Sequence, residues 1–234
     1  MRRLLPVLAT VAALAAAPAA LACGEGGYSY AGLAAATRAF GISASLTPLA
    51  SFSIATGHTA GWVGVGGPHQ GAGGADEWLQ VGFNTIGGLD GSNLYYEVAR
   101  GGVAPEYHQI ATNVPMGRPA KVAVLEIAGR PEWWRVWVNG TAVSKPIRLA
   151  GSHGRWAPIA TAESWDGGAG ACNPFLYRFH AVMVARSAGG SWTPLAGTSP
   201  ITSPTTKLQR SARTTSFVAA QGQVALRSLA SLSP

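Results

Sequence analysis

The sequence predicts an all-β protein, an antiparallel β-sandwich or jelly roll built as one domain. Its 234 residues include 31 Gly, 15 Pro and 8 Trp but few charged side chains, which suits short strands joined by tight turns. About ten short runs alternate apolar with polar or small residues, and turn signals separate them roughly every 8 to 12 residues. The chain shows no repeat period and no heptads, so one domain is the simplest organisation.

Period-two alternation marks each expected strand. Strands are predicted at 41–46, 62–65, 78–83, 94–100, 107–112, 121–128, 158–162, 177–185 and 214–219, with a hairpin at 133–143. In that hairpin, Asn139 and Gly140 lie between two apolar runs and accept the positive φ angles of a tight turn. The alanine-rich run from Leu33 to Phe40 could form a short helix, although it has no capping residue of note.

The first 22 residues have the layout of a secretory signal peptide, in which Arg2 and Arg3 precede an apolar run that ends in Ala-Leu-Ala. We therefore expect a signal peptide at 1–22, a sandwich domain at 23–220 and a flexible C-terminal tail at 221–234. These features predict a secreted, extracellular protein, and we expect it to be a monomer.

The charge and the hydropathy of the sequence argue against two kinds of partner, nucleic acid and the membrane interior. The full chain has a formal charge of +7, of which the predicted signal peptide carries two basic residues. No basic run or RNA-binding motif accompanies this excess, so we expect no nucleic-acid partner. No second apolar span follows the first, so we expect no stable membrane insertion.

The two cysteines, Cys23 and Cys172, predict a disulfide, because export places them in an oxidising compartment. Cys23 directly follows the expected cleavage point, and Ala20 to Cys23 is also near the motif for lipoprotein acylation. Anchoring through Cys23 is therefore the alternative, and we favour the disulfide.

Polar residues within apolar strands are the candidate site residues. Gln80 lies between Leu79 and Val81, so alternation points it to the opposite face, where it is either a solvated side chain or part of a concave site. Glu163 ends an apolar run with Trp165 two residues on, so it is either a turn residue or a carboxylate beside an aromatic wall. Motifs for a serine nucleophile, a zinc site or a phosphate loop are absent from the sequence, and we expect no cofactor and no metal.

Five short motifs, taken in order, resemble the glutamic peptidases called eqolisins. They occur at 29–32, 62–67, 79–82, 95–97 and 161–165, with the sequences SYAG, WVGVGG, LQVG, YYE and TAESW. The chain departs from the family pattern where Gly66 replaces an acidic residue and where Ser164 separates Glu163 from Trp165. It therefore resembles a diverged, bacterial member of that family.

The resemblance implies a concanavalin A-like jelly-roll sandwich and a secreted endopeptidase that works at acidic pH without a metal. The resemblance implies that Gln80 and Glu163 are the catalytic pair and that the substrate is a polypeptide. Glu163 would act as general base and then general acid, while Gln80 would donate to the oxyanion. Trp62, Trp78, Glu97 and Trp165 would line the substrate cleft.

Two other classes of function remain open. The eight tryptophans favour a non-catalytic sandwich module that binds polysaccharide or a cell surface, unless Trp133, Trp134 and Trp137 prove to be hairpin core. A glycoside hydrolase using Glu97 and Glu163 would need its two carboxyls about 5 to 9.5 Å apart.

Overall fold

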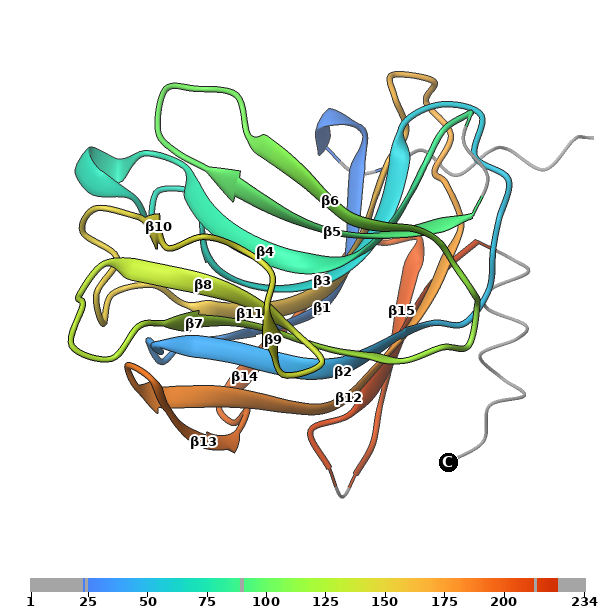
Figure 1. The fold of residues 1–234 in the computed structure, drawn as a ribbon. Coiled ribbons are helices and arrows are strands. Elements are labelled where there is room, and N and C mark those ends of the chain that lie inside the picture. The colour runs from blue at the N-terminus through green and yellow to red at the C-terminus, as the bar shows by residue number, and fades with distance from the viewer. Residues whose placement is uncertain (1–22, 24, 89–90, 213, 223–234) are drawn as a thin grey trace, which may run out of the picture.

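The computed structural model describes residues 23, 25–88, 91–212 and 214–222. The predicted signal peptide at 1–22 and most of the predicted tail lie outside these residues. Within the described residues the chain forms two antiparallel sheets that pack face to face, as Figure 1 shows. The predicted antiparallel sandwich is confirmed.

The first sheet has seven strands in the spatial order β14-β1-β11-β3-β4-β5-β6. In chain order they are β1 (Tyr28–Ala35), β3 (His58–Gly67), β4 (Glu77–Ile86), β5 (Ser92–Ala99), β6 (Glu106–Val114), β11 (Pro158–Trp165) and β14 (Thr198–Thr202). Two short 3-10 turns, η1 (Glu25–Gly27) and η2 (Ala72–Gly74), precede β1 and β4.

The second sheet has nine strands. Seven of them follow the order β10-β8-β7-β2-β12-β16-β15, while β9 pairs with β8 and β13 pairs with β12. In chain order they are β2 (Gly41–Pro48), β7 (Ala120–Glu126), β8 (Trp133–Val138), β9 (Thr141–Ala142), β10 (Ile147–Arg148), β12 (Phe175–Ser187), β13 (Gly190–Pro194), β15 (Thr206–Arg210) and β16 (Phe217–Gln221).

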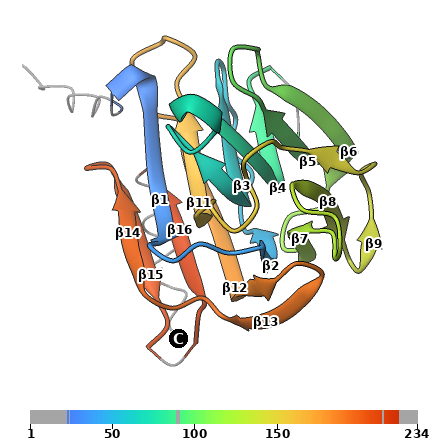
Figure 2. The same cartoon turned by 90° about the vertical axis from the view of Figure 1, so that its left-hand side faces the viewer.

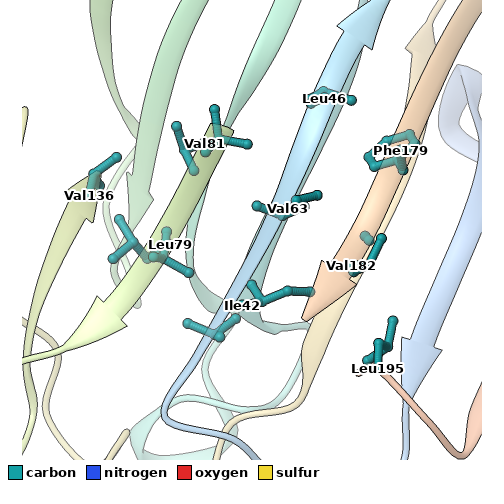
Figure 3. Packing of buried hydrophobic residues seen from close by; sticks show 14 of the residues in the cluster. Ile42, Leu46, Val63, Leu79, Val81, Val136, Phe179, Val182 and Leu195 are labelled. Atoms are coloured by element: carbon teal, nitrogen blue, oxygen red, sulfur yellow. The ribbon is translucent and has the colours of Figure 1, made fainter. Parts of the chain in front are cut away.

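The hydrophobic core lies between the two sheets. Val63, Leu79 and Val81 of the seven-stranded sheet are fully buried in one cluster with Ile42 and Leu46 of the nine-stranded sheet (Figure 3). Side chains of successive strand residues point to opposite faces. The residues that alternate with Leu79 and Val81 therefore face outward from the sandwich.

The predicted hairpin is confirmed at β8 and β9. Val138 pairs with Thr141, and the two residues between them, Asn139 and Gly140, have φ angles of 49° and 82°. Positive φ at both central positions is what a type I′ turn requires. The Asn139 Oδ1 also accepts a hydrogen bond from the Lys121 backbone N–H at 2.9 Å, which ties the turn to β7.

The short helix considered at 33–40 does not form, because residues 33–35 end strand β1 (Tyr28–Ala35) and residues 36–40 are bends and irregular chain. β1 pairs with β11 on one side and with β14 on the other, and Leu33 and Ala35 are buried in the core. At Gly32, an added Cβ would lie 2.4 Å from the Ala160 carbonyl oxygen, so only glycine allows this close approach. Pairing on both edges outweighs the intrinsic helix preference of alanine.

The serine- and threonine-rich segment after β12 contributes more strands than the sequence predicts. β16 confirms the strand expected near 214–219, and it ends at the buried Gln221. Figure 2 shows β14 and β15 along one edge of the sandwich, where β14 borders β1. Among the described residues, no helix is long and apolar enough to span a membrane.

The predicted disulfide joins Cys23 to Cys172, with the two Cα atoms 5.1 Å apart and 149 residues apart in sequence. It ties the start of the described chain to the loop between β11 and β12. In that loop, the Asn173 Nδ2 donates to the carbonyls of Thr56 and Trp165, each at 2.8 Å. Since the bond uses the Cys23 sulfur, it takes the atom that lipidation would need.

Candidate active site

A cleft of about 560 Å³ lies on the outer face of the seven-stranded sheet. An adjoining pocket of about 340 Å³ continues it toward β6. The residues that line both cavities are His58, Gln80, Glu97 and Glu163. These four side chains therefore lie where the two parts of the cleft meet.

Strand register explains why Gln80 and Glu163 share this face. Glu163 on β11 pairs with Ala60 on β3, and Ala60 pairs with Asn84 on β4. Directly paired residues point to the same side of a sheet, as do residues four apart on one strand. Gln80 is four residues before Asn84, so its side chain leaves the sheet on the same side as that of Glu163.

Gln80 is buried, with 5% of its surface exposed. Its Nε2 donates to the Tyr95 hydroxyl at 3.0 Å. An amide nitrogen carries two protons, so the second remains for another acceptor. Gly64 lies directly opposite on β3, where an added Cβ would come within 3.0 Å of the Gln80 Cβ, so a glycine there leaves Gln80 its room.

Glu163 lies within β11, paired with Tyr30 on one side and Ala60 on the other, and is therefore not a turn residue. It is 8% exposed. Its Oε1 is 3.5 Å from the His58 Nε2. A nearly buried carboxylate that faces a cleft is a group that can exchange protons with a molecule bound there.

A third cavity, of about 580 Å³, lies beside the glycine-rich loop before β4. Arg38 and Arg155 line it together with the loop backbone, but its lining has no carboxylate and none of the predicted site residues. The predicted site residues therefore line the cleft and not this third cavity.

No protein-family model and no curated relative matches the sequence. Solved structures do match it. A scytalido-glutamic peptidase with a peptide-based transition-state analogue has a TM-score of 0.58 and 17% identity, over 85% of this chain and 99% of that chain. SCP-B, a member of the eqolisin family of peptidases in complex with the tripeptide Ala-Ile-His, has a TM-score of 0.54 and 16% identity over the same shares.

The chain has an eqolisin-like fold. Identities of 16 and 17% establish the fold alone, so the catalytic roles of Gln80 and Glu163 stay predictions.

The other predicted site residues also line the cleft. Trp62, Trp78 and Glu97 border its larger part, and Trp165 borders the adjoining pocket. The Trp78 Nε1–H donates to Glu97 Oε1 at 2.9 Å, which fixes both side chains. The Trp62 indole N–H has no hydrogen-bond partner among the described residues.

Tyrosines surround Glu163 in this fold. Burial is the main cause that raises the pKa of Tyr28, Tyr30 and Tyr95, and the Glu163 carboxylate raises each of them further. Raised tyrosine pKa values keep these hydroxyls protonated at acidic and neutral pH. The tyrosines therefore offer hydrogen-bond donors to the cleft but add no charge.

Burial also raises the pKa of Glu97 above the ordinary value for glutamic acid. The hydrogen bond from Trp78 and the charge of His58 lower this pKa, while the charge of Glu163 raises it. The folded protein therefore binds the Glu97 proton more tightly than the unfolded chain does. Its contribution to stability falls as pH rises through the interval between the two pKa values.

Replacing Glu97 with Gln should consequently stabilise the protein at neutral pH, because the variant never buries this charge. At a pH well below the ordinary range of glutamic acid, wild type and variant should melt at nearly equal temperatures. Thermal melts of both proteins from acidic to neutral pH test whether the difference in melting temperature grows in favour of the variant as pH rises. The exposed Glu106→Gln is the control; it loses an exposed ion pair with Arg100, so any effect at neutral pH should be a small destabilisation, opposite in sign. A Glu97→Gln effect that does not change with pH would contradict the prediction.

The sequence interpretation did not name His58 as a site residue. The available signal was alternation, since His58, Ala60 and Trp62 occupy every second position of one strand and so share a face. It also missed Asn84 and Tyr107, whose side chains hydrogen-bond at 3.3 Å beside the adjoining pocket. Among the described residues, no group of three or more His, Cys, Asp or Glu side chains could hold a metal ion.

Proposed function

We propose that this chain is a secreted endopeptidase of the glutamic type, which hydrolyses polypeptides at acidic pH. The observation that carries the proposal is the convergence of Gln80 and Glu163 on one cleft of an eqolisin-like fold. An amide donor and a nearly buried carboxylate facing the same space are the two groups that a metal-free attack of water on a peptide carbonyl needs.

In this proposal, the Glu163 carboxylate takes a proton from a water molecule as that water attacks the scissile carbonyl carbon. The carbonyl oxygen becomes an oxyanion, which accepts a hydrogen bond from the free N–H of Gln80. Glu163, now protonated, returns the proton to the leaving amine nitrogen as the C–N bond breaks. The products are a carboxylic acid and an amine, and Glu163 is ionised again.

The secreted location is part of the proposal. The disulfide between Cys23 and Cys172 supports it, because such bonds persist in oxidising compartments. The working unit that we propose is a monomer, since the residues named for the chemistry all come from one chain.

The test is cleavage of an acid-denatured protein by the purified chain at acidic pH, in the presence of a metal chelator and of pepstatin. Wild type should cleave despite both inhibitors. Gln80→Ala should lower turnover by about two orders of magnitude, as expected for loss of one oxyanion donor. Gln209→Ala, a half-buried strand glutamine in the nine-stranded sheet, is the matched control and should remain fully active. Wild-type protein that leaves the substrate intact, or a fully active Gln80→Ala, would contradict the proposal.

A polysaccharide-binding module is the second candidate function. Stacked aromatic rings beside the cleft favour this candidate. The ring centroids of Tyr28 and Trp165 are 6.1 Å apart, and Trp165 is 36% exposed. Trp134 weakens it, because this residue is fully buried core, while Trp133 and Trp137 are half-buried on the other side of β8. Adding a polysaccharide to the same assay separates the cases: binding without cleavage indicates a module, and cleavage of the polysaccharide indicates a glycoside hydrolase.

A further inference from the structure

His58 lies beside the predicted catalytic carboxylate. It is the first residue of β3, and its Nε2 is 3.5 Å from Glu163 Oε1. This distance exceeds that of a short N–H···O hydrogen bond, so the contact acts mainly through charge. The side chains of His58 and Glu163 are 28% and 11% exposed, and partial removal of water strengthens the attraction between an imidazolium and a carboxylate.

Aromatic neighbours hold the His58 ring in this position. The ring packs edge-on against Tyr28, with centroids 6.2 Å apart, and at a tilt against Trp165, with centroids 5.7 Å apart. His58 and Trp165 are also directly paired between β3 and β11. The contact with Glu163 is therefore built into the packing of two strands and does not depend on a mobile side chain.

The contact orients the Glu163 carboxylate, whose Oε1 is 3.5 Å from the His58 Nε2. Attraction to an imidazolium on one side restricts rotation of the carboxylate about its terminal bond. The carboxylate then stays turned toward the cleft, where it can take the proton of an attacking water.

Among the titratable groups near this pair, Glu97 is the one whose own charge changes at acidic pH, and burial raises its pKa. The titratable side chains that Glu163 influences are Tyr28 and Tyr30 from β1, Tyr95 and Glu97 from β5, and Tyr177 from β12. All four tyrosines have raised pKa values and stay neutral at acidic pH. Asp166, three residues after Glu163, is bound by the N–H groups of Gly168 and Gly170 at 2.7 and 2.9 Å.

We infer that His58 is a positioning residue for Glu163: in its protonated form it keeps the carboxylate ionised and oriented. Proteolysis then continues to a lower pH than Glu163 alone would allow. This inference rests on the proposed peptidase function. A histidine is suited to the role because it is protonated throughout the acidic range in which the carboxylate must stay charged.

The first test is the pH dependence of kcat/KM. In His58→Gln the acid limb of the profile should move to higher pH by about one unit, because a neighbouring positive charge favours the ionised carboxylate by about that much or more. His58→Arg keeps a positive charge at every pH and should restore the limb toward its wild-type position. His180→Gln, which removes an exposed histidine of β12, should leave the profile unchanged.

The second test does not depend on activity. The ring protons of His58 can be followed by NMR as pH changes, in wild type and in Glu163→Gln. Loss of the carboxylate should lower the midpoint of the His58 titration, since the imidazolium loses its partner. Thermal melts of each variant establish that it is folded.

The outcomes separate the inference from the function on which it rests. An active wild type whose acid limb does not move in His58→Gln overturns the role of His58 and leaves the peptidase proposal intact. Failure of folded His58→Arg to restore the limb, or an unchanged His58 midpoint in Glu163→Gln, also overturns it. A wild type without proteolytic activity overturns both, and the NMR titration then reports only whether the ion pair forms.

Discussion

Replacing Glu163 with Gln should remove most of the proteolytic activity while the protein stays folded. The substituted side chain would keep the shape of the original and its ability to accept a hydrogen bond, but an amide cannot accept the proton of the attacking water. Positioned acid–base groups contribute about 10²- to 10⁴-fold to rate, and Glu163 is proposed to serve both as base and as acid. We therefore expect turnover to fall by at least about two orders of magnitude. Initial rates on a denatured protein at acidic pH measure this.

Glu106→Gln makes the same chemical change on the exposed strand β6 and should leave turnover unchanged. In the double variant of Gln80→Ala and Glu163→Gln, the loss of transition-state stabilisation should be smaller than the sum of the losses in the two single variants. The reason is that both groups act on one transition state. Full proteolysis by folded Glu163→Gln would remove the peptidase mechanism and leave the binding module as the better candidate.

Among the variants proposed here, the one without the Cys23–Cys172 disulfide should lose the most free energy of unfolding. The bond closes a loop of 149 residues, and the chain-entropy account gives a stabilisation of about 5 kcal/mol for a loop of this length. For a domain of this size that corresponds to a fall in melting temperature of roughly 10 to 20 °C. Urea unfolding of the Cys23→Ser, Cys172→Ser double variant beside oxidised wild type measures the difference.

Two observations could contradict this prediction. Titration of two free thiols in the purified, non-reduced wild type would show that the bond does not form. An unchanged unfolding midpoint in the double variant would show that the bond does not stabilise the fold. Wild type treated with a reductant is the matched control, and its midpoint should approach that of the double variant.

Local alternation and turn chemistry were sufficient for much of the fold. β4 illustrates this, since Leu79 and Val81 could be assigned to the core and Gln80 to the opposite face from period two alone. The turn at Asn139 and Gly140 could be predicted because few residues accept positive φ. Strand β1 could not, because its alanine-rich sequence favours a helix in isolation and becomes a strand only between β11 and β14.

In the candidate site, too, some residues could be predicted from local sequence patterns and others only from the pairing of distant strands. Gln80, Glu163 and the cleft tryptophans could be named from their positions in alternating strands and from the order of five short motifs. His58 could not be connected to Glu163, because 105 positions in the chain separate them and only the pairing of β3 with β11 brings them to 3.5 Å. The room around Gln80 likewise depends on Gly64, which lies on the neighbouring strand.

The sequence by itself determined the all-β class, the hairpin, the cysteine pair and the face on which Gln80 lies. All of these follow from interactions between near neighbours, from backbone preferences or from composition. The tertiary structure alone decided which strands are adjacent, that β1 is a strand and that His58 meets Glu163. Strand neighbours are selected by the burial of a shared core and by backbone pairing between distant segments, and neither is encoded in any one stretch of the chain.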